Sequence, residues 1–184
     1  METVREVCQY IGSLLDAQPV CIETGTTYTC APGNEIHTTT NNIYEHICIP
    51  LDGTFYSLDI DPEHQQFAVN MLEPLYAEAE SVRMKFIEGD SVESLWHLNR
   101  KGLEVDLLCL DSKEFDEDHM VNEYNTIKGS LRPDKHFVLV DDIHNPNSVK
   151  YKKAVPLLQD LGYKGVEIPT PTGLYVFCKG YDLP

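Results

Sequence analysis

The chain has 184 residues, with 30 acidic side chains against 14 basic ones, so its formal net charge is −16. This length fits one domain with a single core, and a hydrophobic content of 42% excludes a disordered chain. The sequence has no run of about 18 apolar residues that could span a membrane. Met1 is not followed by the basic and apolar segments of a secretory signal.

Apolar residues recur along the chain at spacings that alternate between helical and extended. The helical spacing predicts helices over 2–17, around 43–49, and over 62–80, 91–99, 116–129 and 148–161. The extended spacing predicts strands at 20–22, 55–60, 84–87, 105–110, 136–140, 163–168 and 173–179. Residues 24–42 are rich in Thr, Gly, Asn and Pro, and we expect them to form a loop.

Strands that alternate with helices predict right-handed crossovers and a mostly parallel sheet. The last two strands are joined only by residues 169–173, which are too few for a crossover, so these strands are expected to be antiparallel. We therefore expect one α/β domain over 1–184. It would be a doubly wound, Rossmann-like sheet of seven strands, mostly parallel, with an antiparallel C-terminal hairpin and helices on both faces.

The cysteines and the net charge predict the cellular compartment of the protein and the class of its binding partner. Six cysteines form no CxxC pair, and three of them fall inside predicted strands, which favours buried, reduced thiols in a cytoplasmic protein. An acidic surface repels phosphate backbones, so bulk nucleic acid is an unexpected partner. The longest basic cluster, at residues 150–153, is too short to change that expectation.

Acidic residues follow nearly every predicted parallel strand, at the edge where open α/β sheets bind their ligands. They are Glu23, Asp59, Asp61, Glu88, Asp90, Asp111, Asp141 and Asp142. A single acid of this kind is often a helix cap. Several at one edge concentrate negative charge, which costs stability unless cations or hydroxyl donors compensate. The sequence therefore predicts a binding site at this edge.

Two groups of these residues differ in chemistry. Asp59 is placed to accept hydrogen bonds from both ribose hydroxyls of a nucleotide-like ligand, and Gly25 lets backbone amides approach that ligand. Asp90 and Ser91, at a helix start, are placed to meet an adenine edge. The second group consists of three hard carboxylates that suit Mg²⁺, Ca²⁺ or Mn²⁺. These are Asp111, Asp141 and Asp142.

The order of elements, the terminal hairpin and the acids at strand ends resemble a class I S-adenosylmethionine-dependent methyltransferase over essentially the whole chain. Residues 20–25 resemble the first motif of that family, 56–61 its ribose-binding motif and 88–91 its adenine-binding motif. Residues 108–111 and 138–142 are similar to the cation-dependent O-methyltransferases. The resemblance implies cofactor contacts from Glu23, Gly25, Thr26, Thr40, Asp59, Asp90, Ser91 and Asp111, and metal ligation by Asp111, Asp141 and Asp142.

The chain departs from the family pattern at three places. Thr26 and the residues after it replace further glycines of the first motif, and Thr40 or Asn41 at the next helix start is expected to compensate. In the cation-dependent group a lysine commonly stands three residues after the first metal-binding aspartate. Here Lys113 stands two residues after it, and Glu114 holds the usual place. The sequence shows no cap domain, so we expect a substrate pocket that is either shallow or completed by another subunit of a homo-oligomer.

These observations predict metal-assisted transfer of a methyl group from S-adenosylmethionine to an oxygen of a small hydroxylated molecule. The divalent cation, with Mg²⁺ favoured, would lower the pKa of the bound oxygen, and Lys113 or His144 would take the proton. Two alternatives stay open: metal-independent transfer to a nitrogen or carboxylate, and a non-catalytic module that binds S-adenosylmethionine. A nicotinamide-dependent oxidoreductase is disfavoured because no G-x-G-x-x-G follows the first strand.

Overall fold

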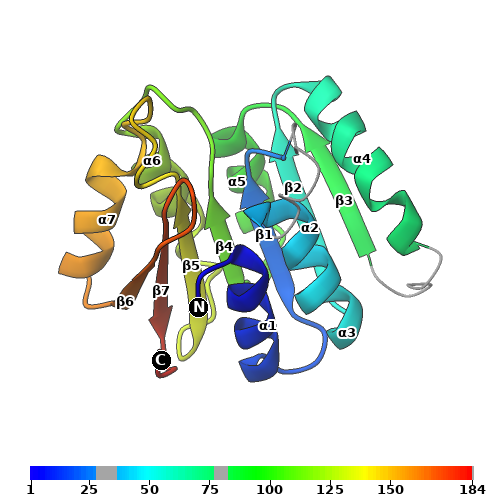
Figure 1. Ribbon diagram of the computed structural model, residues 1–184, viewed down its shortest axis with the longest axis horizontal. Helices are drawn as coiled ribbons and strands as arrows, with labels where there is room; N and C mark the ends of the chain where they lie inside the picture. Colours follow the sequence, from blue (N-terminus) through cyan, green and yellow to red (C-terminus); the bar gives the residue numbers. More distant parts are fainter. Residues whose placement is uncertain (28–36, 77–82, 184) are drawn as a thin grey trace.

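The computed structural model describes residues 1–27, 37–76 and 83–183, and its elements are labelled in Figure 1. Its strands are β1 (Val20–Thr24), β2 (Thr54–Asp59), β3 (Arg83–Glu88), β4 (Leu107–Leu110), β5 (His136–Asp141), β6 (Lys164–Ile168) and β7 (Leu174–Lys179). Its helices are α1 (Val4–Leu14), α2 (Thr39–Ile43), the π-helix η2 (Tyr44–Cys48), α3 (Ile49–Leu51), α4 (Pro62–Tyr76), α5 (Ser91–Asn99), α6 (His119–Ile127) and α7 (Tyr151–Asp160).

The seven strands form one sheet in the order β3-β2-β1-β4-β5-β7-β6. The first five strands along the chain pair in parallel, whereas β7 runs antiparallel to both β5 and β6. This confirms the predicted mostly parallel sheet with an antiparallel C-terminal pair. The strand order reverses between β1 and β4, and such a switch point is where doubly wound sheets bind ligands.

Helices cover both faces of the sheet, as predicted, and Figure 1 shows α1 and α2 on one face with α5 and α6 on the other. Successive residues of a strand point to opposite faces. In β1, Cys21 therefore packs into the core under α1, and Ile22 packs into the core under α5, α6 and α7. Buried parallel strands of this kind read as nearly continuous apolar runs, which is why the sequence located them.

Some element boundaries differ from the prediction. The expected loop over 24–42 gives way to helix at Thr39, and residues 28–36 lie outside the described residues. The helix expected over 62–80 is described as far as Tyr76, and the helix expected over 116–129 begins only at His119. Five cysteines are buried with free thiols, and Cys30 falls outside the described ranges. In the described part of the chain, no helix is long and apolar enough to cross a bilayer.

Candidate functional site

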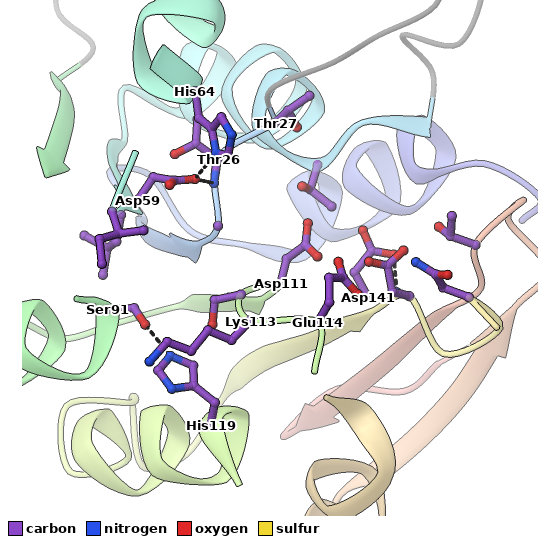
Figure 2. A pocket seen from close by; sticks show the side chains of 18 of the residues that line it. Thr26, Thr27, Asp59, His64, Ser91, Asp111, Lys113, Glu114, His119 and Asp141 are labelled. Atoms are coloured by element: carbon purple, nitrogen blue, oxygen red, sulfur yellow. Dashed lines mark hydrogen bonds and ion pairs between the residues drawn. The ribbon is translucent and has the colours of Figure 1, made fainter. Parts of the chain in front are cut away.

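A cavity of about 700 Å³ opens at the carboxyl ends of the parallel strands (Figure 2). Segments that follow all five parallel strands contribute to its wall, so the predicted edge is one continuous site. The predicted site residues that line it are Gly25, Thr26, Asp59, Asp90, Ser91, Asp111, Lys113, Asp141 and Asp142. The cavity spans the switch point between β1 and β4, which brings together residues far apart in the sequence.

The turn after β1 fixes the carboxylate at the end of β2. Asp59 Oδ2 accepts a hydrogen bond from the backbone N–H of Thr26 at 2.8 Å, and Nδ1 of His64 lies 3.2 Å from the same oxygen. The Thr26 hydroxyl lies 2.7 Å from that of Ser57. Asp59 is buried but lines the cavity, so an acidic acceptor is presented there on a rigid support.

Glu23 and Thr40 lie behind this turn and are not among the described residues that line the cavity. Glu23 is fully buried, and its Oε2 accepts hydrogen bonds from the hydroxyls of Thr40 at 2.7 Å and Ser57 at 3.0 Å. The Thr40 hydroxyl in turn accepts from the backbone N–H of Thr27 at 2.9 Å. Burial raises the pKa of Glu23 to about 8. Both side chains therefore support the turn from within.

Asp90 and Ser91 begin α5 beside the cavity. Asp90 caps the helix, accepting hydrogen bonds from the backbone N–H groups of Val92 at 3.0 Å and Glu93 at 3.2 Å. Ser91 Oγ lies 2.8 Å from Nε2 of His119. Both predicted residues thus face the cavity, although the cap occupies one carboxylate oxygen of Asp90.

A buried carboxylate behind Ser91 was missed by the sequence analysis. Glu123 is fully buried in α6 and accepts hydrogen bonds from the hydroxyls of Ser91, Ser112 and Thr24. His119 lies one turn earlier, with Nε2 3.2 Å from Glu123 Oε1. The spacing of four residues between His119 and Glu123 was the available signal, since it places both on one helix face.

The second group of acids surrounds a lysine. Nζ of Lys150 lies 2.6 Å from Asp111 Oδ1, 2.8 Å from Asp142 Oδ2 and 3.0 Å from Glu114 Oε1. The Lys150 side chain is fully buried, and Nζ is also 3.3 Å from the carbonyl oxygen of Asp111. We call Asp111, Glu114, Asp142 and Lys150 the acid cluster.

Asp111 and Asp142 thus meet, but Asp141 is not the third member of the carboxylate group. Its Oδ1 accepts from the backbone N–H of Asp142 at 2.8 Å, and Glu114 holds the third position. Burial raises the pKa of Asp141 well above its usual range, and it raises that of Asp111 to about 7 despite the Lys150 charge. Burial alone would lower the pKa of Lys150, but the charges of Asp111 and Asp142 outweigh it and raise that pKa.

The acid cluster fits a divalent cation only in part. One ligand oxygen from each of Asp111, Glu114 and Asp142 lies within 4.8 Å of the others, and carboxylates suit Mg²⁺. However, the ammonium of Lys150 is within hydrogen-bond distance of all three carboxylates and lies where such an ion would bind. With Lys150 in this position the residues do not fit a metal ion.

The two expected proton acceptors lie apart from the acid cluster. Lys113 lines the cavity, but its Nζ is 3.4 Å from Asp90 Oδ2, and Figure 2 shows it extending toward Ser91 rather than Asp141. His144 Nε2 pairs with Glu167 Oε1 at 2.9 Å, and His144 is not among the described residues of the cavity wall.

The sequence indicated Lys150 only as part of the basic cluster at residues 150–153, without a role in the site. The structure places Lys150 directly before α7, and Ala154 and Leu158 follow at intervals of four residues on the buried face of that helix. That helical spacing was the signal that separates Lys150 from the exposed lysines 152 and 153.

Known proteins share this fold at low sequence identity. No protein-family model matches the chain, and no curated protein does. A methyltransferase structure from Geobacter sulfurreducens is 13% identical with a TM-score of 0.64, covering 95% of this chain and 77% of its own. A Corynebacterium glutamicum protein is 14% identical with a TM-score of 0.65, covering 97% and 81%.

A third similar structure carries ligands. It is the MycE methyltransferase of the mycinamycin biosynthetic pathway, in complex with Mg, S-adenosylhomocysteine and mycinamycin VI. It is 14% identical with a TM-score of 0.59, and the match covers 97% of this chain but half of MycE. With the sheet order and the cavity at its switch point, these similarities show that the chain has the fold of the class I S-adenosylmethionine-dependent methyltransferases.

Proposed function

We propose that the protein is an S-adenosylmethionine-dependent methyltransferase that acts on a small polar acceptor. The observation that carries this proposal is the single cavity that joins Asp59, at the end of β2, to the acids after β4 and β5. A donor with an adenosine at one end and a positively charged sulfonium at the other matches that distribution of groups. The S-adenosylhomocysteine bound to MycE, which shares the fold, supports the same choice of cofactor.

The proposed cofactor lies across the ends of the strands. Asp59 would accept hydrogen bonds from its ribose hydroxyls, Asp90 and Ser91 would contact its adenine, and the turn at Gly25 would contact its chain. Asp111 and the nearby carboxylates would stabilise the positive charge of the sulfonium. Glu23 and Thr40 act indirectly in this arrangement, by holding the turn that contacts the cofactor.

Methyl transfer then needs positioning and one proton acceptor. A lone pair of the acceptor attacks the methyl carbon in line with the carbon–sulfur bond, and the bonding electrons return to sulfur to give S-adenosylhomocysteine. The acceptor proton passes to a carboxylate. Asp111 and Asp141 line the cavity, whereas the Lys113 ammonium pairs with Asp90 and His144 pairs with Glu167, so we assign this role to one of the two carboxylates. A carboxylate whose pKa is near neutrality makes an effective base.

The negative charge of the site favours a methyl acceptor that can donate a hydrogen bond. Three carboxylates, from Asp111, Glu114 and Asp142, surround one buried ammonium, and Asp141 lies beside them in the cavity wall. An anionic acceptor would be repelled, whereas the hydroxyl group of a small hydroxylated molecule, or an amine, would donate to these oxygens. The solved structures that share the fold also include an rRNA methylase from Streptococcus thermophilus. A net charge of −16 favours a small molecule over nucleic acid.

Metal assistance, the form of the reaction expected from the sequence, rests on two observations. The carboxylates of Asp111, Glu114 and Asp142 converge, and the structure of MycE includes Mg. Against these stands the ammonium of Lys150 between the carboxylates. We therefore propose methyl transfer without assigning a step to a metal ion.

The test combines binding with turnover. Calorimetry with S-adenosylhomocysteine should show one site, whereas NAD⁺, as the control ligand, should not bind. Incubation with S-adenosylmethionine and a panel of small alcohols, phenols and amines should then release S-adenosylhomocysteine. Cofactor binding without turnover on any acceptor would indicate a non-catalytic binding module, and failure to bind S-adenosylhomocysteine would refute the proposal.

A further inference from the structure

Lys150 is a fully buried cation at this edge of the sheet, and carboxylates surround its ammonium. Its side chain is fully buried, and it starts from the residue that precedes α7. The three protons of its ammonium match three carboxylate oxygens, on Asp111, Asp142 and Glu114, at 2.6, 2.8 and 3.0 Å. The ammonium is thus saturated with carboxyl oxygen acceptors.

A cation between the three carboxylates stabilises their arrangement. Their ligand oxygens lie within 4.8 Å of one another, and at that separation like charges repel strongly when partly removed from water. A positive charge at their centre relieves that repulsion. Lys150 supplies it from within the chain, at the point where a divalent ion would have to bind.

A metal ion and Lys150 cannot share this centre. To admit an ion, the lysine would have to leave three carboxylate partners, and a buried ammonium without partners is very costly. The buried face of α7 continues with the apolar side chains of Ala154 and Leu158, which cannot accept a hydrogen bond from that ammonium. The folded chain therefore favours its own cation over a free one.

We propose that the ammonium of Lys150 is the resident cation of the acid cluster, and that it holds Asp111 and Asp142 in place without a divalent ion. Lys150 is a positioning residue, because its ammonium is fully buried and donates its three protons to carboxylates, which leaves no proton for a substrate. The replacement of a metal ion by Lys150 does not depend on the proposed function. The part of the inference that depends on the proposed function is the orientation of Asp111 toward a methyl acceptor.

The first experiment uses the unmodified protein. Titration with Mg²⁺ or Mn²⁺ in a calorimeter should show no saturable binding up to millimolar concentrations, and a chelator should leave the melting temperature unchanged. Stoichiometric binding of either ion, lost in Asp142→Asn, would overturn the proposal. This measurement decides the question even if no Lys150 variant folds.

The second experiment removes the charge while keeping the length of the side chain. Lys150→Met should melt at a lower temperature and should gain a single Mn²⁺ or Mg²⁺ site that restores part of the loss. Lys153→Met is the matched control, because Lys153 is half exposed and pairs with Asp118 at 2.8 Å on the surface of the same helix. It should gain no ion site. A purely structural lysine would lower stability without creating such a site.

The outcome for the ion site is separable from that for the cofactor. Adding Asp142→Asn to Lys150→Met should abolish the gained site, and unchanged ion binding in that double variant would contradict the proposal. Titration of the same proteins with S-adenosylhomocysteine reports on the proposed function alone. A protein that binds neither ion nor S-adenosylhomocysteine would support Lys150 as resident cation and refute the methyltransferase proposal.

Discussion

The α-carbon of Gly25 faces the carbonyl oxygen of Asp111 so closely that a Cβ at Gly25 would lie 2.3 Å from that oxygen. The contact joins the carboxyl ends of β1 and β4, the two strands between which the sheet order reverses. The backbone of Gly25 also has φ of +81°, a conformation that favours glycine. The floor of the cavity is therefore made of two backbones in direct contact.

Gly25→Ala should lower the free energy of unfolding by about 3 kcal/mol or more, because a left-handed conformation and a steric clash act together. Gly102→Ala is the matched control, with φ of +67° but nothing within 4 Å of the added Cβ. It should cost only about 1 kcal/mol. Urea denaturation of both variants measures the difference, and equal losses would show that the approach to Asp111 is not tight.

Asp59→Asn should weaken binding of S-adenosylhomocysteine about 10- to 100-fold, since one charged acceptor for the ribose hydroxyls is lost. Asp61→Asn provides the comparison, because Asp61 is nearby on the same turn but its side chain is 44% exposed. Calorimetry on both variants separates a specific contact from a general loss of negative charge. Similar affinities in the two variants would remove Asp59 from the cofactor site.

We expect the contribution of Glu23 to the free energy of unfolding to decrease as the pH rises. Burial raises its pKa to about 8 from an ordinary value of 4.5, so between these values the folded state holds a proton that the unfolded state releases. This contribution is present at low pH and is lost as the pH rises, at no more than about 1.4 kcal/mol per pH unit.

Glu23→Gln removes that titration. Relative to the unmodified protein, its free energy of unfolding should improve steadily between about pH 5 and about pH 8, as measured by urea denaturation. Glu93→Gln serves as control, because the Glu93 side chain is 75% exposed. A constant difference across that range for Glu23→Gln would show that Glu23 is ionised in the folded protein.

The acids of the site were predictable because their positions depend on strand ends. Asp59 ends β2 and Asp111 follows β4, and both strands are apolar runs that the sequence shows clearly. Parallel strands bring their carboxyl ends to one edge, so the convergence followed from the fold class. The same reasoning placed Asp90 and Ser91 correctly beside the cavity.

The partners of those acids were not predictable in the same way. Lys150 and Asp111 are 39 residues apart in the sequence. Their contact therefore depends on the path of two loops and on the rotation of α7 about its axis. Asp141 and Asp142 were predicted to act together as metal ligands. The backbone of Asp142 has a φ of +62°, and of these two residues only Asp142 pairs with Lys150. His144 illustrates the same difficulty, because proximity in sequence to Asp142 did not fix the direction of its side chain.

The pH dependence of turnover should identify the proton acceptor. Burial raises the pKa of Asp111 to about 7, so a base at this position becomes ionised, and therefore active, as the pH rises through about 7. We expect kcat to increase across that range in the unmodified protein, and in Lys113→Met and His144→Ala, whose side chains pair with Asp90 and Glu167 instead. Asp111→Asn should lower kcat about 100-fold or more and flatten the profile. If the limb near neutrality disappears in Lys113→Met and persists in Asp111→Asn, the lysine takes the proton after all.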